Sequence, residues 1–321
     1  MSVRTNTPWL ARIWNQASES HCGSAYVTGK LLLPSQYIGP NVETSNSKMR
    51  VVLENFDGLL EVIMIPLDLK RELTTYFLWP EGWDRNDRSK CIIFNNPNGV
   101  TVPQFFQENG LAYTPGQLVD VVKCPIILYD YAGTGINGEV DTVDEPVSFQ
   151  ASATYSSVVN DGEAVLNFVV GMGFKDVTNW GSSLGGGVAA AATASFYEKR
   201  EWTPLNVGVV NHDSFTTTPR VLAPWAGRIG DWFGSIVGGN LDAETPMRKL
   251  VEKGVKVLIL CHNQDPVIPE GARIAEIFQE QTGMNAIVFC SPEYGHANLS
   301  LDMINQVEKI LGPPNEDSST S

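Results

Sequence analysis

A G-x-S-x-G pattern spans residues 181–185 (GSSLG) and has Ser183 at its centre. The pattern stands between an apolar run at 175–180, which predicts a strand, and a helical pattern at 186–199. A nucleophilic serine in a tight strand-to-helix turn needs glycine two residues before and after it, because a Cβ has no room there. Ser182 does not have this flanking. The spacing predicts Ser183 as a nucleophile, whereas a glycine-rich helix entry without chemistry is the plainer interpretation.

Asp265 and His296 each follow a further predicted strand, at 255–260 and 285–290. A serine hydroxyl is a poor nucleophile until a base takes its proton, and the imidazole needs a carboxylate to fix its tautomer. The chain order Ser183, Asp265, His296 is the order expected when the nucleophile lies in such a strand-to-helix turn, called a nucleophile elbow. Taken alone, Asp265 is more simply interpreted as a solvated acid in a turn. His296 alone is more simply interpreted as a polar group at the start of a helix. Together they predict a Ser-Asp-His triad.

Two other acids could orient His296. Asp213 follows the predicted strand 205–210, but the surrounding NHDSFTTTP also reads as a loop with an N-cap or Asx turn. Glu293 lies close to His296 in sequence and fits a solvated loop charge. We therefore place both behind Asp265.

The remaining histidines give weak support for a metal site. His262 ends a predicted strand and is expected to be a packed residue, and His212 lies near a strand exit and could line a pocket. A zinc site from His212, His262 and Asp265 is conceivable, but no H-x-x-x-H or C-x-x-C spacing supports it. Phosphate-loop and dinucleotide-binding glycine motifs are also missing from the sequence. We expect no metal and no cofactor.

Short apolar runs alternate with helical patterns along most of the chain. The predicted strands are 91–96, 125–130, 175–180, 205–210, 255–260 and 285–290, and the predicted helices are 158–172, 186–199, 268–282 and 300–311. Solid apolar strands that alternate with helices indicate a mostly parallel sheet covered on both faces. Two β-branched runs, 49–56 and 59–67, flank Asp57-Gly58 and predict an antiparallel hairpin at the amino-terminal edge.

Composition shifts divide the chain into three parts. We expect an extension at 1–47, an α/β domain at 48–312 and a disordered tail at 313–321. Within the domain, 221–240 carries apolar residues at helical spacing. A helix docked on the core is the favoured interpretation, and a lid or acyl-chain wall over the nucleophile is the alternative.

Several segments resemble those of the α/β-hydrolase superfamily, over about residues 48–311. They are CIIFNNPNGV (91–100), YDYAGTG (129–135), WGSSLGGGVA (180–189), DPVIP (265–269) and YGH (294–296). The resemblance implies an α/β-hydrolase fold, and it does not resolve the subfamily. The elbow segment is similar to that of serine hydrolases acting on esters and thioesters, including the depalmitoylating branch.

One segment departs from the family pattern. Asn96-Pro97 stands where the family normally has His-Gly after its third strand. By position, the resemblance implies the backbone N–H groups of Asn98 and Leu184 as the oxyanion donors.

Charge and cysteine pattern limit the partners and the compartment. With 22 Lys plus Arg against 36 Asp plus Glu, the net charge is −14, which disfavours binding to nucleic acid or to anionic membranes. No apolar stretch reaches the roughly 18 residues of a membrane span.

The five cysteines show no C-x-x-C pair, so we expect buried free thiols in a reducing compartment. Residues 1–20 do not resemble a Sec signal, which predicts a cytoplasmic protein, with signal-less secretion as an effector as the alternative.

These features predict a serine hydrolase that cleaves an ester or thioester of a small-molecule or lipid-like acyl substrate. A peptidase would use the same triad. A catalytically silent scaffold that serves as a binding or effector module is the other alternative, because of Asn96-Pro97. The substrate, the acyl length, the protein partner and the oligomeric state are not encoded in any motif of the sequence.

Overall fold

The structure is a computed structural model, and it describes only part of the 321 residues. The described residues are 58–67, 72–98, 100–102, 105, 115–132, 134, 137, 155–200, 206–221, 241–279 and 286–312. The extension predicted at 1–47, the tail at 313–321 and residues 222–240 of the possible lid lie outside them.

All eight strands of the described residues belong to one sheet, in the order β1-β2-β4-β3-β5-β6-β7-β8. Their bounds are β1 Leu59–Pro66, β2 Glu72–Trp79, β3 Lys90–Asn95, β4 Ile126–Tyr129, β5 Asp176–Ser182, β6 Asn206–His212, β7 Val257–Gln264 and β8 Ala286–Tyr294. The neighbours from β4 to β8 run parallel, and β2 pairs antiparallel with both β1 and β4. The prediction of a mostly parallel sheet with an antiparallel edge hairpin is confirmed.

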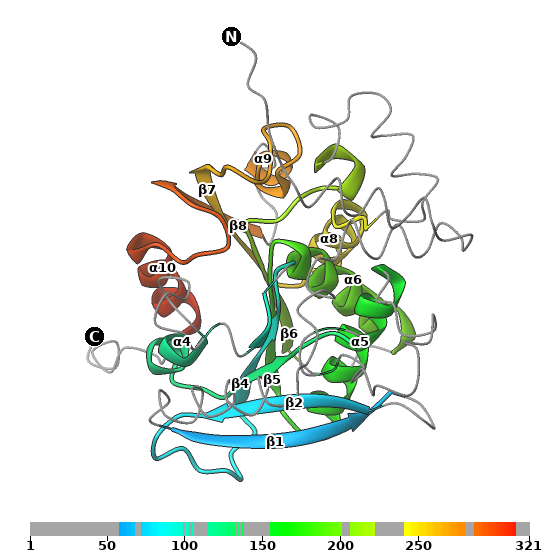
Figure 1. The fold of residues 1–321 in the computed structure, drawn as a ribbon, viewed down its shortest axis with the longest axis vertical. Coiled ribbons are helices and arrows are strands. Elements are labelled where there is room, and N and C mark those ends of the chain that lie inside the picture. The colour runs from blue at the N-terminus through cyan, green and yellow to red at the C-terminus, as the bar shows by residue number, and fades with distance from the viewer. Residues whose placement is uncertain are drawn as a thin grey trace, which may run out of the picture.

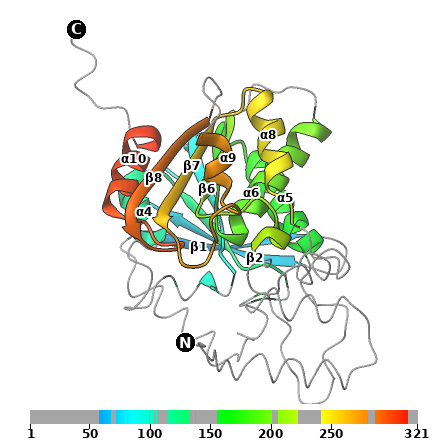
Figure 2. The same cartoon turned by 90° about the horizontal axis from the view of Figure 1, so that it is seen from above.

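Helices cover both faces of this sheet (Figure 1). Their bounds are α4 Pro115–Val122, α5 Tyr155–Gly171, α6 Leu184–Lys199, α8 Glu244–Glu252, α9 Ile274–Gln279 and α10 Leu301–Leu311. The view from above in Figure 2 places α4 and α10 on one face and α5, α6, α8 and α9 on the other. Successive strand residues serve opposite faces, so Ile93 packs with the α5 side whereas Ile92 packs with α4 and α10. Strands buried on both faces therefore read as solid apolar runs.

The edge hairpin uses a strand that the sequence analysis did not identify. β1 pairs with β2 over its whole length, from Leu59 opposite Trp79 to Pro66 opposite Glu72. The predicted partner, 49–56, lies outside the described residues. β2 was missed because threonines precede its apolar half and interrupt the hydrophobic pattern. One of them, Thr75, is nevertheless fully buried.

The predicted helix 268–282 is wrong at its start, because α9 begins only at Ile274. The preceding backbone turns around Asp265, whose Oδ1 accepts the N–H groups of Val267 (2.7 Å) and Ile268 (2.9 Å). Gly271 then adopts a φ of +80°. The apolar residues here keep a helix-like spacing although the chain is a loop. The sequence analysis also missed α4 and α8.

Free buried thiols were expected for the four cysteines in or beside apolar runs, and this is wrong for Cys261 and Cys290, which form a disulfide. They are direct partners in the β7–β8 register, with Cα atoms 4.5 Å apart. Cys91 and Cys124 are free and buried, as expected. Because disulfides persist in oxidising compartments, the cysteine pattern no longer argues for a reducing one.

None of the described helices has the length and apolar character needed to cross a bilayer.

Candidate active site

Ser183 occupies the sharp turn between β5 and α6, with a φ of +51°. This left-handed backbone is unfavourable for a residue with a side chain, at a cost of about 1–3 kcal/mol. Neighbouring groups hold it from both sides. The Ser183 N–H donates to the His212 carbonyl (2.8 Å), and its own carbonyl accepts from the Gly186 N–H (3.0 Å) and the Ser214 hydroxyl (2.8 Å). The turn is thus fixed by the exit of β6 as well as by its own helix.

The flanking glycines leave no room for a side chain. A Cβ on Gly181 would lie 1.9 Å from the Gly185 carbonyl oxygen, and a Cβ on Gly185 would lie 2.1 Å from the Asn95 carbonyl oxygen. The next position is also tight, since a Cβ on Gly186 would approach the Ser214 Cβ to 2.5 Å. The steric reason given for the G-x-S-x-G spacing is therefore confirmed at both glycines.

The structure brings Ser183, Asp265 and His296 together at the carboxyl ends of β5, β7 and β8. His296 Nε2 lies 3.0 Å from Ser183 Oγ, and His296 Nδ1 lies 2.8 Å from Asp265 Oδ2. Because a carboxylate only accepts hydrogen bonds, Nδ1 carries the proton in this contact. In the neutral ring, the lone pair of Nε2 then faces the serine hydroxyl. This is the arrangement that a proton transfer from serine to imidazole requires.

Leu184 and Asn98, the two residues expected to supply oxyanion donors, follow Ser183 and the neighbouring strand β3, respectively. Leu184 is the first residue of α6, whose leading N–H groups have no acceptor within the helix. Asn98 lies in the turn after β3, and β3 pairs with β5 so that Asn95 is opposite Gly181. Both backbones therefore lie at the carboxyl ends of β3 and β5, the end of the sheet that carries Ser183.

No family model matches the chain, and no curated protein matches it either. Solved structures do match. An esterase of Pyrococcus furiosus superimposes with a TM-score of 0.54 at 11% identity, over 80% of this chain and 89% of that one. A putative hydrolase of Agrobacterium vitis superimposes with a TM-score of 0.50 at 18% identity, over 78% and 97%.

The chain has the α/β-hydrolase fold. Its mostly parallel sheet carries an antiparallel edge hairpin and helices on both faces, and it superimposes on these neighbours over 78–80% of its length. At such low identities the likeness shows the fold, and the chemistry depends on the site itself.

The departure from the α/β-hydrolase pattern at Asn96-Pro97 has a local structural role. The buried Asn96 side chain donates to the Tyr129 carbonyl and to Asp130 Oδ1, both at 2.9 Å. The Tyr131 hydroxyl in turn donates to the Asn96 carbonyl at 2.9 Å. Asn96 therefore ties the loop after β3 to the end of β4, which holds the segment that carries Asn98.

The alternative acids take other places. The Asp213 carboxylate contacts His212, His262 and Ala297, whereas the His296 ring is hydrogen-bonded to Asp265. Glu293 is exposed, as predicted, but it belongs to β8 and not to a loop. His262 is fully buried at the end region of β7, in agreement with a packed strand residue.

The cluster of His212, Asp213 and His262 is what sequence reasoning missed. The zinc site considered from sequence combined the two histidines with Asp265, but the acid that lies between them is Asp213. Its Oδ2 is 2.7 Å from His262 Nδ1 and 3.2 Å from His212 Nε2. These contacts are accounted for by hydrogen bonding. The available signal was that all three residues stand at the exits of neighbouring strands.

Asp213 is a buried carboxylate that keeps its charge. Burial is the largest single influence and by itself raises the pKa. The charge of His212 and the hydrogen bonds from His212 and His262 together outweigh it and hold the Asp213 pKa well below its usual range. These contacts therefore favour the ionised form of the buried Asp213 carboxylate.

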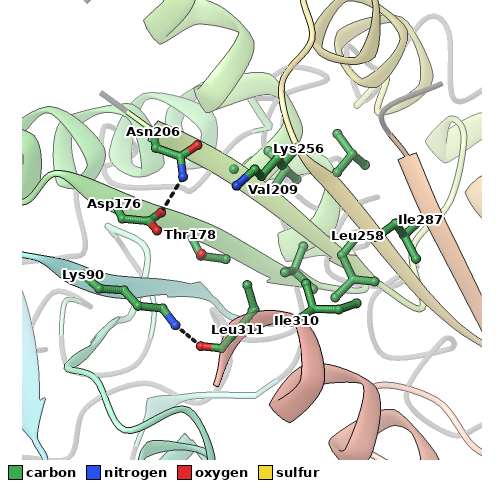
Figure 3. Close-up of a pocket in the computed structure, with 13 residues that line it drawn as sticks. Lys90, Asp176, Thr178, Asn206, Val209, Lys256, Leu258, Ile287, Ile310 and Leu311 are labelled. Atoms are coloured by element: carbon green, nitrogen blue, oxygen red, sulfur yellow. Dashed lines mark hydrogen bonds between the residues drawn. The ribbon is translucent and has the colours of Figure 1, made fainter. Parts of the chain in front are cut away.

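A cavity of about 490 Å³ lies at the opposite edge of the sheet. Figure 3 shows its lining, which includes Asp176 and Asn206 at the starts of β5 and β6 and Leu311 at the end of α10. Ser183 lies beyond the other end of β5. This cavity is thus separate from the candidate active site.

Proposed function

We propose that the chain is a serine hydrolase that cleaves a carboxylic ester or thioester through an acyl-enzyme on Ser183. The observation that carries the proposal is the continuous contact from Ser183 Oγ to His296 Nε2 and from His296 Nδ1 to Asp265. It is combined with a strained nucleophile turn whose glycines admit no Cβ. A structural polar cluster needs neither the strain nor the three separate strand exits.

In the proposed mechanism, Ser183 Oγ attacks the acyl carbonyl while His296 Nε2 takes its proton. Asp265 keeps the imidazole oriented and stabilises the imidazolium. The N–H groups of Leu184 and Asn98 donate to the oxyanion of the tetrahedral intermediate. The intermediate collapses as the leaving alcohol or thiol takes the proton from His296. A water molecule, deprotonated by the same ring, then releases the acid and restores Ser183.

Two observations support an acyl ester or thioester as the substrate class. The elbow WGSSLGGGVA resembles that of hydrolases acting on such bonds, and one structural neighbour is described as an esterase. An ester or thioester also has a better leaving group than an amide, so its tetrahedral intermediate collapses to the acyl-enzyme more readily. We therefore place peptide substrates second.

The proposal is tested by intact-mass spectrometry after incubation with a fluorophosphonate. We expect one adduct on the wild type and none on Ser183→Ala. Ser195→Ala is the matched control, because Ser195 lies on the same helix but its hydroxyl donates to Glu163 at 2.8 Å, away from the turn. It should be labelled like the wild type. A folded wild type without an adduct would contradict the mechanism and favour the silent scaffold.

A further inference from the structure

The buried Asp213 connects three elements that surround the triad. Its Oδ1 accepts the backbone N–H of His262 (2.8 Å), and its Oδ2 accepts from His262 Nδ1 (2.7 Å) and from the Ala297 N–H (2.9 Å). Asp213 follows β6, His262 lies on β7, and Ala297 is the residue after His296. One carboxylate therefore joins two strand ends to the loop that carries the proposed base.

This loop has a conformation that needs such support. Ala297 adopts a φ of +60°, which is unfavourable for a residue with a Cβ. Each neighbouring backbone group has its own partner: the His296 N–H donates to Asn298 Oδ1 (2.9 Å), and the Asn298 carbonyl lies 3.1 Å from His212 Nε2. The hydrogen bond to Asp213 is the one made by the strained residue itself. Its loss would leave the conformation that positions His296 without its main compensation.

The cluster also reaches the nucleophile turn. His212 Nε2 faces two acceptors, the Asn298 carbonyl and Asp213, so it carries a hydrogen. The other ring nitrogen, Nδ1, lies 3.3 Å from the Ser182 hydroxyl oxygen. Ser182 is bonded directly to Ser183. The polar cluster thus contacts both chain segments whose separation sets the distance between nucleophile and base.

The charge of Asp213 is close enough to matter in the reaction. Acceptor or donor atoms of Asp213, Asp265 and His296 all lie within 4.8 Å of one another. The imidazolium that forms when Ser183 loses its proton would have two carboxylates beside it, only one of which hydrogen-bonds to the ring. An opposite charge at this distance stabilises the charged ring.

From these contacts we propose that Asp213 is a positioning residue, which holds the loop of His296 in its reactive conformation and adds a second negative charge beside the ring. The proposal rests on the proposed hydrolase function, because positioning has a catalytic meaning only if His296 is the base. It assigns Asp213 no contact with the substrate.

The test compares wild type, Asp213→Asn and a matched control, Thr75→Val. The asparagine keeps the shape but replaces one acceptor oxygen by an NH₂ group that opposes the surrounding N–H donors. Thr75 is also buried, and its hydroxyl donates to the Ile63 carbonyl (2.7 Å) within the β1–β2 hairpin, which is separated from β6 by β4, β3 and β5. The probes are fluorophosphonate labelling of Ser183, kcat and KM on a p-nitrophenyl ester, and the low-field ¹H NMR signal of His296 Nδ1–H.

We expect Asp213→Asn to label Ser183 about 100-fold more slowly and to lower kcat by a similar factor, because a small misplacement of a catalytic group has effects of this order. KM should stay within about twofold, since the substrate does not contact Asp213. The His296 signal should broaden or vanish. Thr75→Val should match the wild type in all three measurements.

A folded Asp213→Asn variant that labels at the wild-type rate and keeps the His296 signal would overturn the proposal. If the wild type itself is not labelled, the proposed hydrolase function fails, and the NMR comparison alone then decides whether Asp213 positions the ring. Asp213→Ser is the second variant should the asparagine fail to fold. If neither folds while Thr75→Val does, Asp213 is a folding determinant and the positioning role is rejected.

Discussion

Replacing Asp265 by asparagine tests the orientation of the proposed base most directly. Asp265 Oδ1 accepts two backbone N–H groups, from Val267 and Ile268, and Oδ2 faces His296 Nδ1 at 2.8 Å. In Asp265→Asn the amide oxygen should keep the Oδ1 position, because an NH₂ group there would oppose two donors. Each donor left unpaired costs about 1–3 kcal/mol. The NH₂ group must therefore face His296.

The expected loss of rate follows from that orientation. With a donor opposite Nδ1, the ring keeps its hydrogen on Nε2 and has no lone pair for the proton of Ser183. The equivalent change in a well-studied serine protease lowers kcat about 10⁴-fold. At about 1.4 kcal/mol for each factor of ten, this corresponds to about 5.5 kcal/mol of transition-state stabilisation. The hydrogen bonds to Val267 and Ile268 are kept, so the variant should fold normally.

The assay is the rate of fluorophosphonate labelling together with kcat on a p-nitrophenyl ester, with circular dichroism to confirm the fold. Glu293→Gln is the control, because it removes an exposed carboxylate three residues before His296. It should leave both rates within about twofold, as is usual for an exposed site. If Asp265→Asn kept a tenth of the wild-type rate or more, the reasoning would be refuted. Asp213, within 4.8 Å of the same ring, would then be the acid to examine.

Two further predictions concern stability, both measured as the free energy of unfolding in guanidinium. Gly185→Ala should lose about 3 kcal/mol, because its Cβ would lie 2.1 Å from the Asn95 carbonyl oxygen, whereas Gly171→Ala, with nothing within 4 Å, should change it by less than about 1 kcal/mol. Equal effects of the two substitutions would argue against the close packing. Replacing Cys261 and Cys290 by alanine should cost about 3–4 kcal/mol, since the disulfide closes a loop of 29 residues. A wild type whose unfolding is unchanged by a dithiol reductant would contradict this.

The strands of the parallel sheet were predictable because each is buried on both faces. CIIFNN, predicted as 91–96, corresponds to β3 at Lys90–Asn95, and its successive residues serve opposite faces of the sheet. Hydrophobicity fails where a polar group is buried with a partner. Thr75 made β2 look irregular, although its hydroxyl is paired with the Ile63 carbonyl.

Contacts between distant segments were not predictable from pattern. Cys261 and Cys290 carry no spacing motif, and only the register of β7 against β8 places them opposite each other. The same holds for Asp213 and His262. Both were noted as residues near strand exits, but whether an acid at β6 binds a histidine ring, a loop N–H or both depends on distances of a few tenths of an ångström. The residue types in the sequence indicate at which edge of the sheet the active site lies. The role of each residue there can be assigned only from the side-chain geometry in the structure.

The backbone strain of the described residues is concentrated at this edge. Four described non-glycine residues have a positive φ: Lys123, which precedes β4 at the other end of the sheet, and Ser183, Asp213 and Ala297, which lie at this edge. The last three belong to the proposed nucleophile turn, the polar cluster and the histidine loop. Each strained N–H has a hydrogen-bond acceptor: the His212 carbonyl for Ser183, the Leu260 carbonyl for Asp213, and the Asp213 carboxylate for Ala297. Backbone strain persists only where the surrounding structure fixes it. The segments that follow β5, β6 and β8 therefore form one preorganised unit. This is the reason for expecting Asp213→Asn to affect the rate of the chemical step more than the binding of substrate.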